Sequence, residues 1–248
     1  MVEKAQSEGI SLRILGGLAV RLHCLEYLNL LQKLGRVTQF ADMDVITLAE
    51  NQKRLEPFFK QNGFNPEPKM RRTPAIWAYR HVYLRPDGKS NVDVFFDKLE
   101  MSHTIDLRQR LAVDSPTISL ADLLLAKLQI HEINEKDVKD AIVLIRAHEI
   151  ADSDQESINE KYIAQLMSQD WGFYHTVTTN LRKTTLLLHD YEIDESDKND
   201  VLSKIDRLLS RIESEPKTSL FRLRARIGEK KKWYNEVDET VRDVLEWR

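Results

Sequence analysis

Three short segments of this sequence constrain its fold most strongly, because their chemistry makes sense only if they lie together. Gly16-Gly17 follows an apolar run. Asp42 and Asp44 stand two residues apart, and Asp93 lies inside a second apolar run. Side chains alternate between the two faces of a β-strand, so Asp42 and Asp44 are expected on one face, where Asp93 on a neighbouring strand can join them. The pattern predicts a sheet on which three carboxylates converge.

The composition of the 248-residue chain fits a helix-rich globular protein. Hydrophobic residues make up 42% and charged residues 31%, with only 8 glycines and 7 prolines, which excludes a low-complexity or disordered chain. The formal net charge of −3 gives no overall basic character, so any contact with nucleic acid requires a local patch. At this length we expect two structural units.

Cysteine usage and hydropathy favour a cytoplasmic protein that does not contact a membrane. The single cysteine, Cys24, rules out an internal disulfide and lies on the expected apolar stripe of the first helix, where a buried structural thiol is common. Residues 1–9 are charged and lack the apolar run of a signal peptide. No segment approaches the roughly 18 uninterrupted apolar residues of a membrane span.

The spacing of apolar residues predicts an α+β fold over residues 1–150. Period-two runs predict strands at 10–15, 42–48, 75–85, 91–96 and 103–111. Pro86-Asp87-Gly88 is a turn sequence that joins two of these strands as a hairpin. Helical spacing predicts helices at 16–35, 50–62, 119–132 and 136–148. We expect a mixed sheet of about four or five strands with flanking helices.

The sequence changes character at residues 151–157, a polar segment beyond which only helical periodicity is present. This periodicity predicts helices at 158–169, 173–189, 198–213 and 219–247. We therefore predict a second, all-helical domain over residues 151–248 that closes one side of the cleft.

The three aspartates are candidate ligands for Mg²⁺ or Mn²⁺, because carboxylate oxygens suit hard divalent cations. In a two-metal site Asp42 and Asp44 are expected to hold the ions, while Asp93 shares one and takes the proton of the attacking hydroxyl. Apolar neighbours favour this reading over surface aspartates, since buried acids need a partner. The backbone amides of Gly16 and Gly17, at the start of a helix, are expected to bind phosphate. The combination predicts phosphoryl or nucleotidyl transfer.

The order strand, Gly-Gly, helix, Asp-x-Asp and a third Asp resembles the DNA polymerase β-like nucleotidyltransferase superfamily, over about residues 10–150. Lys127 followed by Asp137 is similar to the helical Lys…Asp motif of the abortive-infection (AbiEii-type) nucleotidyltransferase toxins. The resemblance implies that Lys127 contacts the triphosphate. It also implies that Asp137, with Asp140 as the second choice, completes the site by orienting Lys127 or a base.

The surroundings of Lys127 and of Arg36 in the sequence bear on what each side chain can bind. Lys127 interrupts an otherwise apolar helix, so it needs an anionic partner unless its alkyl stem carries the charge out to solvent. The relatives commonly carry Arg-x-Thr-x-Asp, whereas here two additional residues stand between Thr38 and Asp42. The resemblance therefore does not extend to a phosphate-binding role for Arg36.

Two further segments have alternative interpretations. Strand 75–85 places four rings on one face, which can stack a nucleobase or pack against a helix: Trp77, Tyr79, His81 and Tyr83. The basic segment at 222–232 can contact RNA phosphates or form a solvated helix face.

The predicted function is Mg²⁺-dependent transfer of a nucleoside monophosphate from a nucleoside triphosphate (NTP) to a hydroxyl. The expected acceptor is an RNA 3′ end or a protein, and the resemblance implies the toxin of a toxin–antitoxin pair, with an antitoxin protein as partner. One alternative is an antibiotic nucleotidyltransferase that acts on an aminoglycoside or lincosamide. The other is a catalytically silent nucleotide-binding or regulatory module.

Overall fold

A five-stranded mixed sheet forms the first part of the computed structural model, which describes residues 1–36, 42–73 and 78–237. The strand order is β1-β2-β5-β4-β3, in which β2 and β5 are parallel and the other neighbours antiparallel. The strands are β1 (Arg13–Leu15), β2 (Asp42–Thr47), β3 (Asn65–Pro66), β4 (Arg80–Leu84) and β5 (Asn91–Phe96).

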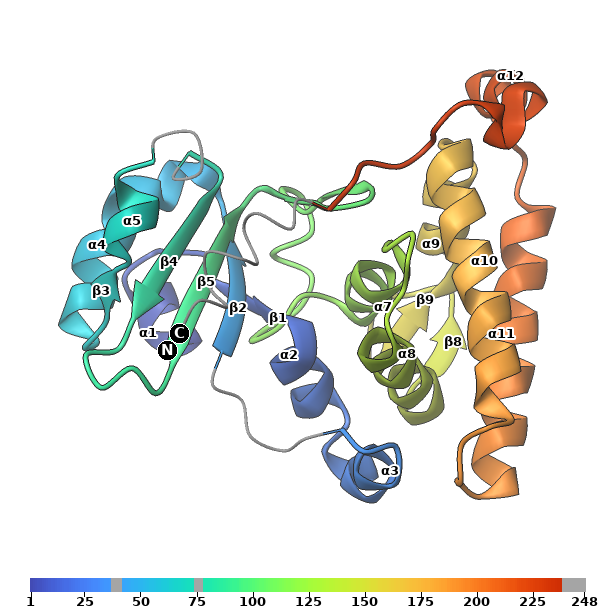
Figure 1. Cartoon of the computed structure of the whole chain (residues 1–248), viewed down its shortest axis with the longest axis horizontal. Helices are drawn as coiled ribbons and strands as arrows, with labels where there is room; N and C mark the ends of the chain where they lie inside the picture. Colours follow the sequence, from blue (N-terminus) through green and yellow to red (C-terminus); the bar gives the residue numbers. More distant parts are fainter. Residues whose placement is uncertain (37–41, 74–77, 238–248) are drawn as a thin grey trace.

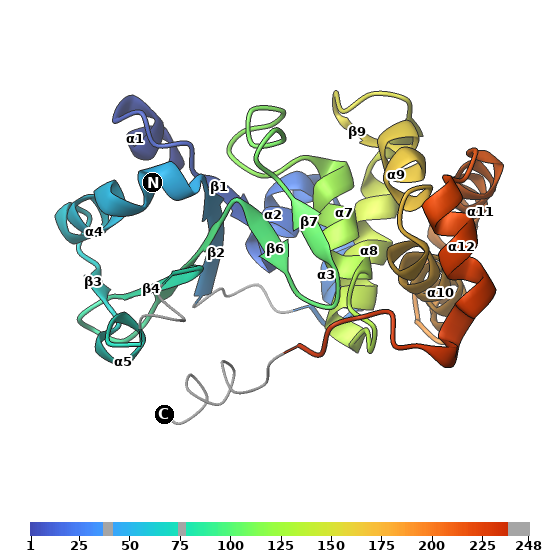
Figure 2. The same cartoon turned by 90° about the horizontal axis from the view of Figure 1, so that it is seen from above.

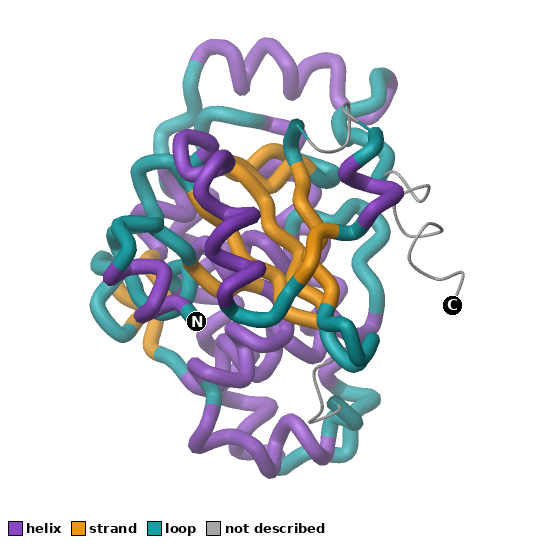
Figure 3. The backbone as a smooth tube through the Cα atoms, turned by 90° about the vertical axis from the view of Figure 1, so that its left-hand side faces the viewer, coloured by secondary structure: helices purple, strands orange, loops and turns teal. Residues whose placement is uncertain are grey.

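Helices cover both faces of this sheet (Figure 1). One face packs against α4 (Gln52–Gln61), where the rings of Phe59 and Tyr83 stack with centroids 4.3 Å apart. Seen from this side in Figure 3, helices cross in front of the strands; α5 (Pro68–Arg71) and α1 (Val2–Ser7) lie in the same part of the molecule. The opposite face is turned toward α2 (Gly16–His23) and α7 (Leu120–Leu128).

The remaining helices pack together beside α7. They are α8 (Glu135–Ala147), α9 (Glu160–Met167), α10 (Trp171–Leu188), α11 (Glu195–Ser214) and α12 (Ser219–Ile227). The buried apolar side chains of the sheet and of helices α7 to α11 form one continuous core. After α12 the chain runs back toward the sheet, where the amide of Asn235 donates to the carbonyl of Ser102 at 2.9 Å (Figure 2). Among the described helices, none has the length and apolar character needed to cross a membrane.

Most predicted elements are present, and β5 has the predicted bounds. The β4–β5 hairpin is confirmed, although part of the predicted strand, residues 75–77, lies outside the described residues. The predicted helix 16–35 is wrong as a single element. It forms α2, a 3₁₀ turn at Leu25–Tyr27 and α3 (Leu28–Lys33). Leu25 is 55% exposed, so the spaced leucines do not form one buried stripe.

The predicted edge strand at 103–111 is also wrong. Only β7 (Thr104–Asp106) forms, and it pairs with β6 (Lys98–Glu100) in a separate two-stranded sheet. Asp97 explains the change, because its φ of 59° turns the chain out of the main sheet directly after β5. The amide of Asp97 still donates to Thr47, at 2.9 Å.

The region after residue 150 is not entirely helical. Strands β8 (Glu149–Ala151) and β9 (Ser157–Asn159) pair in parallel on either side of the predicted domain boundary. Strands of three residues are too short to show alternation in the sequence. The predicted final helix is too long, since α12 ends at Gly228, which has a φ of 58°. Its last ten predicted residues, 238–247, lie outside the described residues.

Candidate active site

The two aspartates at the centre of the site lie side by side on parallel strands. Asp44 of β2 is directly opposite Asp93 of β5, so both side chains belong to the same face of the sheet. Asp42, two residues earlier on β2, shares that face and is exposed. The structure thus brings Asp44 and Asp93 together, with Asp42 at the end of the row.

Gly16 lies against Asp44. Leu15 pairs with Asp44 across the β1–β2 ladder, and the chain then enters α2 at Gly16 with a φ of 69°. A Cβ at Gly16 would collide with Asp44 Oδ2 and lie 3.3 Å from its Cγ. No side chain caps the start of α2, so the first amides of this helix, including Gly16 and Gly17, remain able to bind an anion.

The electrostatic environment of the two aspartates is unfavourable to their charged forms. Burial, and then the neighbouring charge of Asp93, raises the pKa of Asp44 to about 6. Burial also raises the pKa of Asp93, against the opposing effect of Arg80. Asp93 is 6% exposed, and its Oδ1 has no hydrogen-bond partner among the described residues. The buried carboxylate of Asp93 and the half-buried carboxylate of Asp44 therefore favour additional positive charge nearby.

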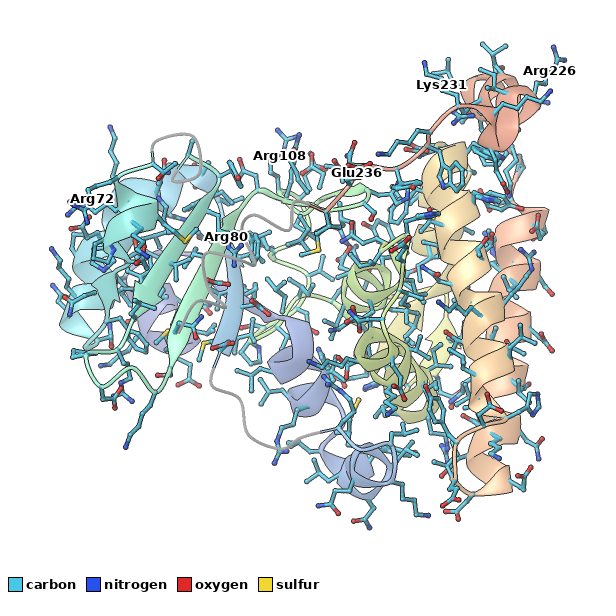
Figure 4. The ribbon with its side chains drawn as sticks, viewed as in Figure 1. Arg72, Arg80, Arg108, Arg226, Lys231 and Glu236 are labelled. Carbon is cyan, nitrogen blue, oxygen red and sulfur yellow. The ribbon has the colours of Figure 1, made fainter. Side chains whose placement is uncertain are left out.

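Arg80 is a cation at the site that the sequence analysis did not select. Its β4 neighbour Val82 is opposite Asp93, so Arg80 lies on the same face, where its guanidinium forms an ion pair with Asp93 Oδ2. The guanidinium also lies over the Phe95 ring, 5.5 Å from its centroid. Figure 4 shows Arg80 over the sheet, far from Arg226 and Lys231 at the α12 end of the molecule.

Lys127 of α7 is buried and has anionic partners, so the alternative in which it reaches solvent is wrong. Its Nζ lies 2.8 Å from Asp137 Oδ1 and 2.9 Å from Asp140 Oδ2. Burial disfavours the charged amine, but Asp140 and Asp137 outweigh burial and raise the pKa of Lys127. Lys127 is also close enough to lower the pKa of Asp44. It therefore stands between the acids of α8 and those of the sheet.

Asp137 and Asp140 are held in place by different contacts. Asp137 lies in the first turn of α8, where Asn134 Nδ2 donates to its Oδ2 at 2.9 Å. Asp140 is 1% exposed and accepts two hydrogen bonds from Arg36, at 2.6 and 3.0 Å. Arg36, to which the resemblance gave no role, thus joins the same network. Its position six residues before Asp42 of the Asp-x-Asp segment was the available signal in the sequence.

No protein-family model matches this chain, and no curated protein matches its sequence. The functional assignment therefore depends on the geometry of the site.

The oxygen ligands available at this site are of the kind that binds a hard divalent cation. Asp44 and Asp93 offer carboxylate oxygens, and Oδ1 of Asp93 is buried without a partner among the described residues. As arranged here, no three His, Cys, Asp or Glu side chains within residues 1–36, 42–73 and 78–237 are grouped closely enough to hold a metal ion. Asp42 is the outlying member, yet its charge raises the pKa of both other aspartates.

The predicted aromatic face does not belong to this site. His81 and Tyr83 flank Val82 on β4 and so point to the face opposite Asp93, where both are buried. The His81 ring packs edge-on against Phe96, with centroids 4.7 Å apart. Packing thus explains these two rings, while Trp77 lies outside the described residues.

Packing accounts for two other features considered from the sequence. Cys24 is fully buried, and burial raises the pKa of its thiol to about 12, in keeping with a structural role. In the basic segment, the guanidinium of Arg224 lies over the Trp171 ring, 4.7 Å from its centroid.

Proposed function

We propose that this protein is a Mg²⁺-dependent nucleotidyltransferase with a nucleotidyltransferase-like sheet, which transfers a nucleoside monophosphate from an NTP to a hydroxyl. The observation that carries the proposal is the pairing of Asp44 with Asp93 on adjacent parallel strands, within the electrostatic reach of buried Lys127. A half-buried and a buried carboxylate beside a buried lysine suit a ligand that carries both signs of charge. A metal-bound triphosphate is such a ligand.

The charges around the site support a dication. The sheet aspartates with Arg80, and the α8 aspartates with Lys127 and Arg36, together contain five carboxylates and three cations. Two negative charges therefore have no counterpart among these side chains. The members are Asp42, Asp44, Asp93, Asp137 and Asp140 against Arg36, Arg80 and Lys127. One Mg²⁺ balances them.

Each group has a defined task in the proposed reaction. The acceptor oxygen attacks the α-phosphorus, and the bond between the α-phosphorus and the bridging oxygen breaks to release pyrophosphate. Asp93 takes the proton of the acceptor hydroxyl, and Lys127 binds the triphosphate. The amides of Gly16 and Gly17 bind phosphate oxygens. Asp42, Asp44 and Asp93 would hold Mg²⁺, which when bound would supply positive charge to stabilise the phosphates in the transition state.

Asp137 and Asp140 are positioning residues in this scheme, because both contact Lys127. The acceptor class follows from the resemblance: an RNA 3′ end or a protein, in a toxin controlled by an antitoxin.

The proposal is tested by thermal unfolding with each of the four NTPs in the presence of Mg²⁺. A ligand that binds only the native state raises the melting temperature. We expect at least one NTP to stabilise the wild type, and Asp44→Asn to lose that stabilisation. Asp106→Asn, which alters an exposed carboxylate remote from the site, is the matched control and should behave as the wild type. Absence of stabilisation by every NTP would instead favour the silent module.

A further inference from the structure

Two Arg–Asp pairs in the site use their hydrogen-bonding groups differently. Arg36 and Asp140 form a complete fork, in which two nitrogens bind both carboxylate oxygens. Arg80 and Asp93 form an incomplete one, because Arg80 binds only Oδ2. Asp93 Oδ1 and Arg80 Nε are both buried and have no partner among the described residues.

The contrast indicates different roles for the two arginines. A buried donor and a buried acceptor without partners are unfavourable, and a purely structural Arg–carboxylate pair is expected to close its fork as Arg36 does. The spare oxygen of Asp93 suits a cation, and the spare nitrogen of Arg80 suits an anion. A metal-bound triphosphate supplies one of each.

We propose that Arg80 is a triphosphate-binding residue. It pairs with Asp93 while the site is empty, and its guanidinium moves to bind a phosphate oxygen when nucleotide and metal bind. This inference rests on the proposed function. Arg80 already lies on the carboxylate face of the sheet, with its guanidinium against Phe95, so the exchange needs only a change of side-chain conformation. Guanidinium groups bind phosphate and carboxylate with the same planar geometry, which makes the two partners interchangeable.

Arg80 then has opposite effects on the two ligands. Without nucleotide it competes with a divalent cation for Asp93, so its removal strengthens metal binding. With nucleotide it contributes a charge-assisted hydrogen bond to the triphosphate, so its removal weakens nucleotide binding. A purely structural arginine would not separate the two affinities in this way.

The test measures two affinities in three proteins. Mn²⁺ binding is followed by electron paramagnetic resonance without nucleotide, and binding of a non-hydrolysable α,β-methylene NTP with Mg²⁺ is followed by calorimetry. Arg80→Gln is expected to bind Mn²⁺ about tenfold more tightly and the analogue about tenfold more weakly than the wild type, as for one charge-assisted contact. Arg108→Gln, which removes an exposed arginine paired with Asp106, should match the wild type in both.

Each remaining outcome counts against a defined part of the account. If the wild type binds both ligands and Arg80→Gln matches it, or loses affinity for both, the role of Arg80 is wrong and the proposed function stands. If the wild type binds neither, both are wrong. If Arg80→Gln does not fold, Arg80→Lys is measured in its place. Lysine retains the positive charge but lacks the planar guanidinium, so this variant is expected to weaken only the binding of the NTP analogue.

Discussion

Gly16 leaves open the space that the carboxylate of Asp44 occupies. A Cβ at this position would collide with Asp44 Oδ2, and the φ of 69° also disfavours any side chain. The glycine of the strand–turn–helix unit therefore does more than permit a turn. It lets the start of α2 and a candidate metal ligand come together, which joins the predicted phosphate-binding and cation-binding parts of the site.

Substitution of Gly16 should affect both stability and metal binding. Gly16→Ala adds backbone strain of about 1–2 kcal/mol and displaces the Asp44 carboxylate. Gly88→Ala is the matched control, because its φ is 67° and its added Cβ would meet nothing within 4 Å. We expect Gly16→Ala to be the more destabilising in urea unfolding and the only one to weaken Mn²⁺ binding. Equal effects on both measurements would contradict this role for Gly16.

Asp44→Asn is expected to stabilise the protein in the presence of a chelator. Because burial and Asp93 raise the pKa of Asp44 to about 6, the charged form is unfavourable in the folded state at pH 8, where the unfolded chain ionises freely. Removing the charge should add about 1–3 kcal/mol to the free energy of unfolding at pH 8. Urea unfolding measures it. A loss of stability would show that this carboxylate is already well compensated without a ligand.

Asp140→Asn should be strongly destabilising, because it leaves Lys127 and Arg36 without their shared buried partner. Breaking a buried ion pair from one side costs about 3–5 kcal/mol. Asp137→Asn is the comparison: Asp137 is partly exposed, and Lys127 retains Asp140 after the change. Chemical unfolding of both variants should place Asp140→Asn well below Asp137→Asn. The reverse order would mean that Asp137 is the main partner of Lys127.

Stability should fall in acid partly because of His103. This residue is buried against Phe173 and hydrogen-bonded to Thr176, and burial lowers its pKa to about 4. Between pH 6.5 and about 4 the unfolded chain takes up a proton that the folded protein does not, so stability is lost as pH falls through this range, by about 3 kcal/mol in total. His103→Gln should lose less stability between pH 7 and 4.5 than the wild type.

The exposed residue His189 provides the control for that titration. If His103→Gln and His189→Gln have the same pH profile, burial of His103 does not explain the acid sensitivity.

Gly172→Ala should destabilise the protein, although alanine is normally the better helix residue by about 1 kcal/mol. A Cβ at Gly172 would lie 2.7 Å from the carbonyl oxygen of Trp233, in the segment that returns from α12 toward the sheet. That carbonyl must move to accommodate it. Thermal unfolding of Gly172→Ala should show a lower melting temperature than the wild type, and an increase would show that the segment moves freely.

Local periodicity in the sequence predicted strands β1, β2, β4 and β5 and the acidic face, but it predicted neither β3 nor the separate pairing of β7 with β6. Because side chains alternate along β2 and β5, the sequence indicated that Asp44 and Asp93 can share one face of the sheet, as they do in the structure. The isolated lysine in an apolar helix likewise indicated that Lys127 needs an anion, and the nearby acids of α8 supply it. In each case the decisive information lies within a few residues of sequence.

What the sequence did not predict depends on contacts between distant segments. The role of Arg80 requires knowing that β4 pairs with β5 in a register that brings it to Asp93. The role of Arg36 requires α3 to end beside α8. The break after α2 and the turn at Asp97 are likewise set by packing and backbone conformation, which periodicity does not report.

Nucleotidyl transfer by this protein can be tested by following two labels in parallel. The protein is incubated with Mg²⁺, cellular RNA or protein, and each NTP labelled with ³²P at either the α or the γ position. We expect that α label enters the acceptor, that γ label is released as pyrophosphate, and that Asp93→Asn abolishes both while Asp106→Asn does not. Entry of γ label into the acceptor, or no transfer of α label from any NTP, would contradict this expectation.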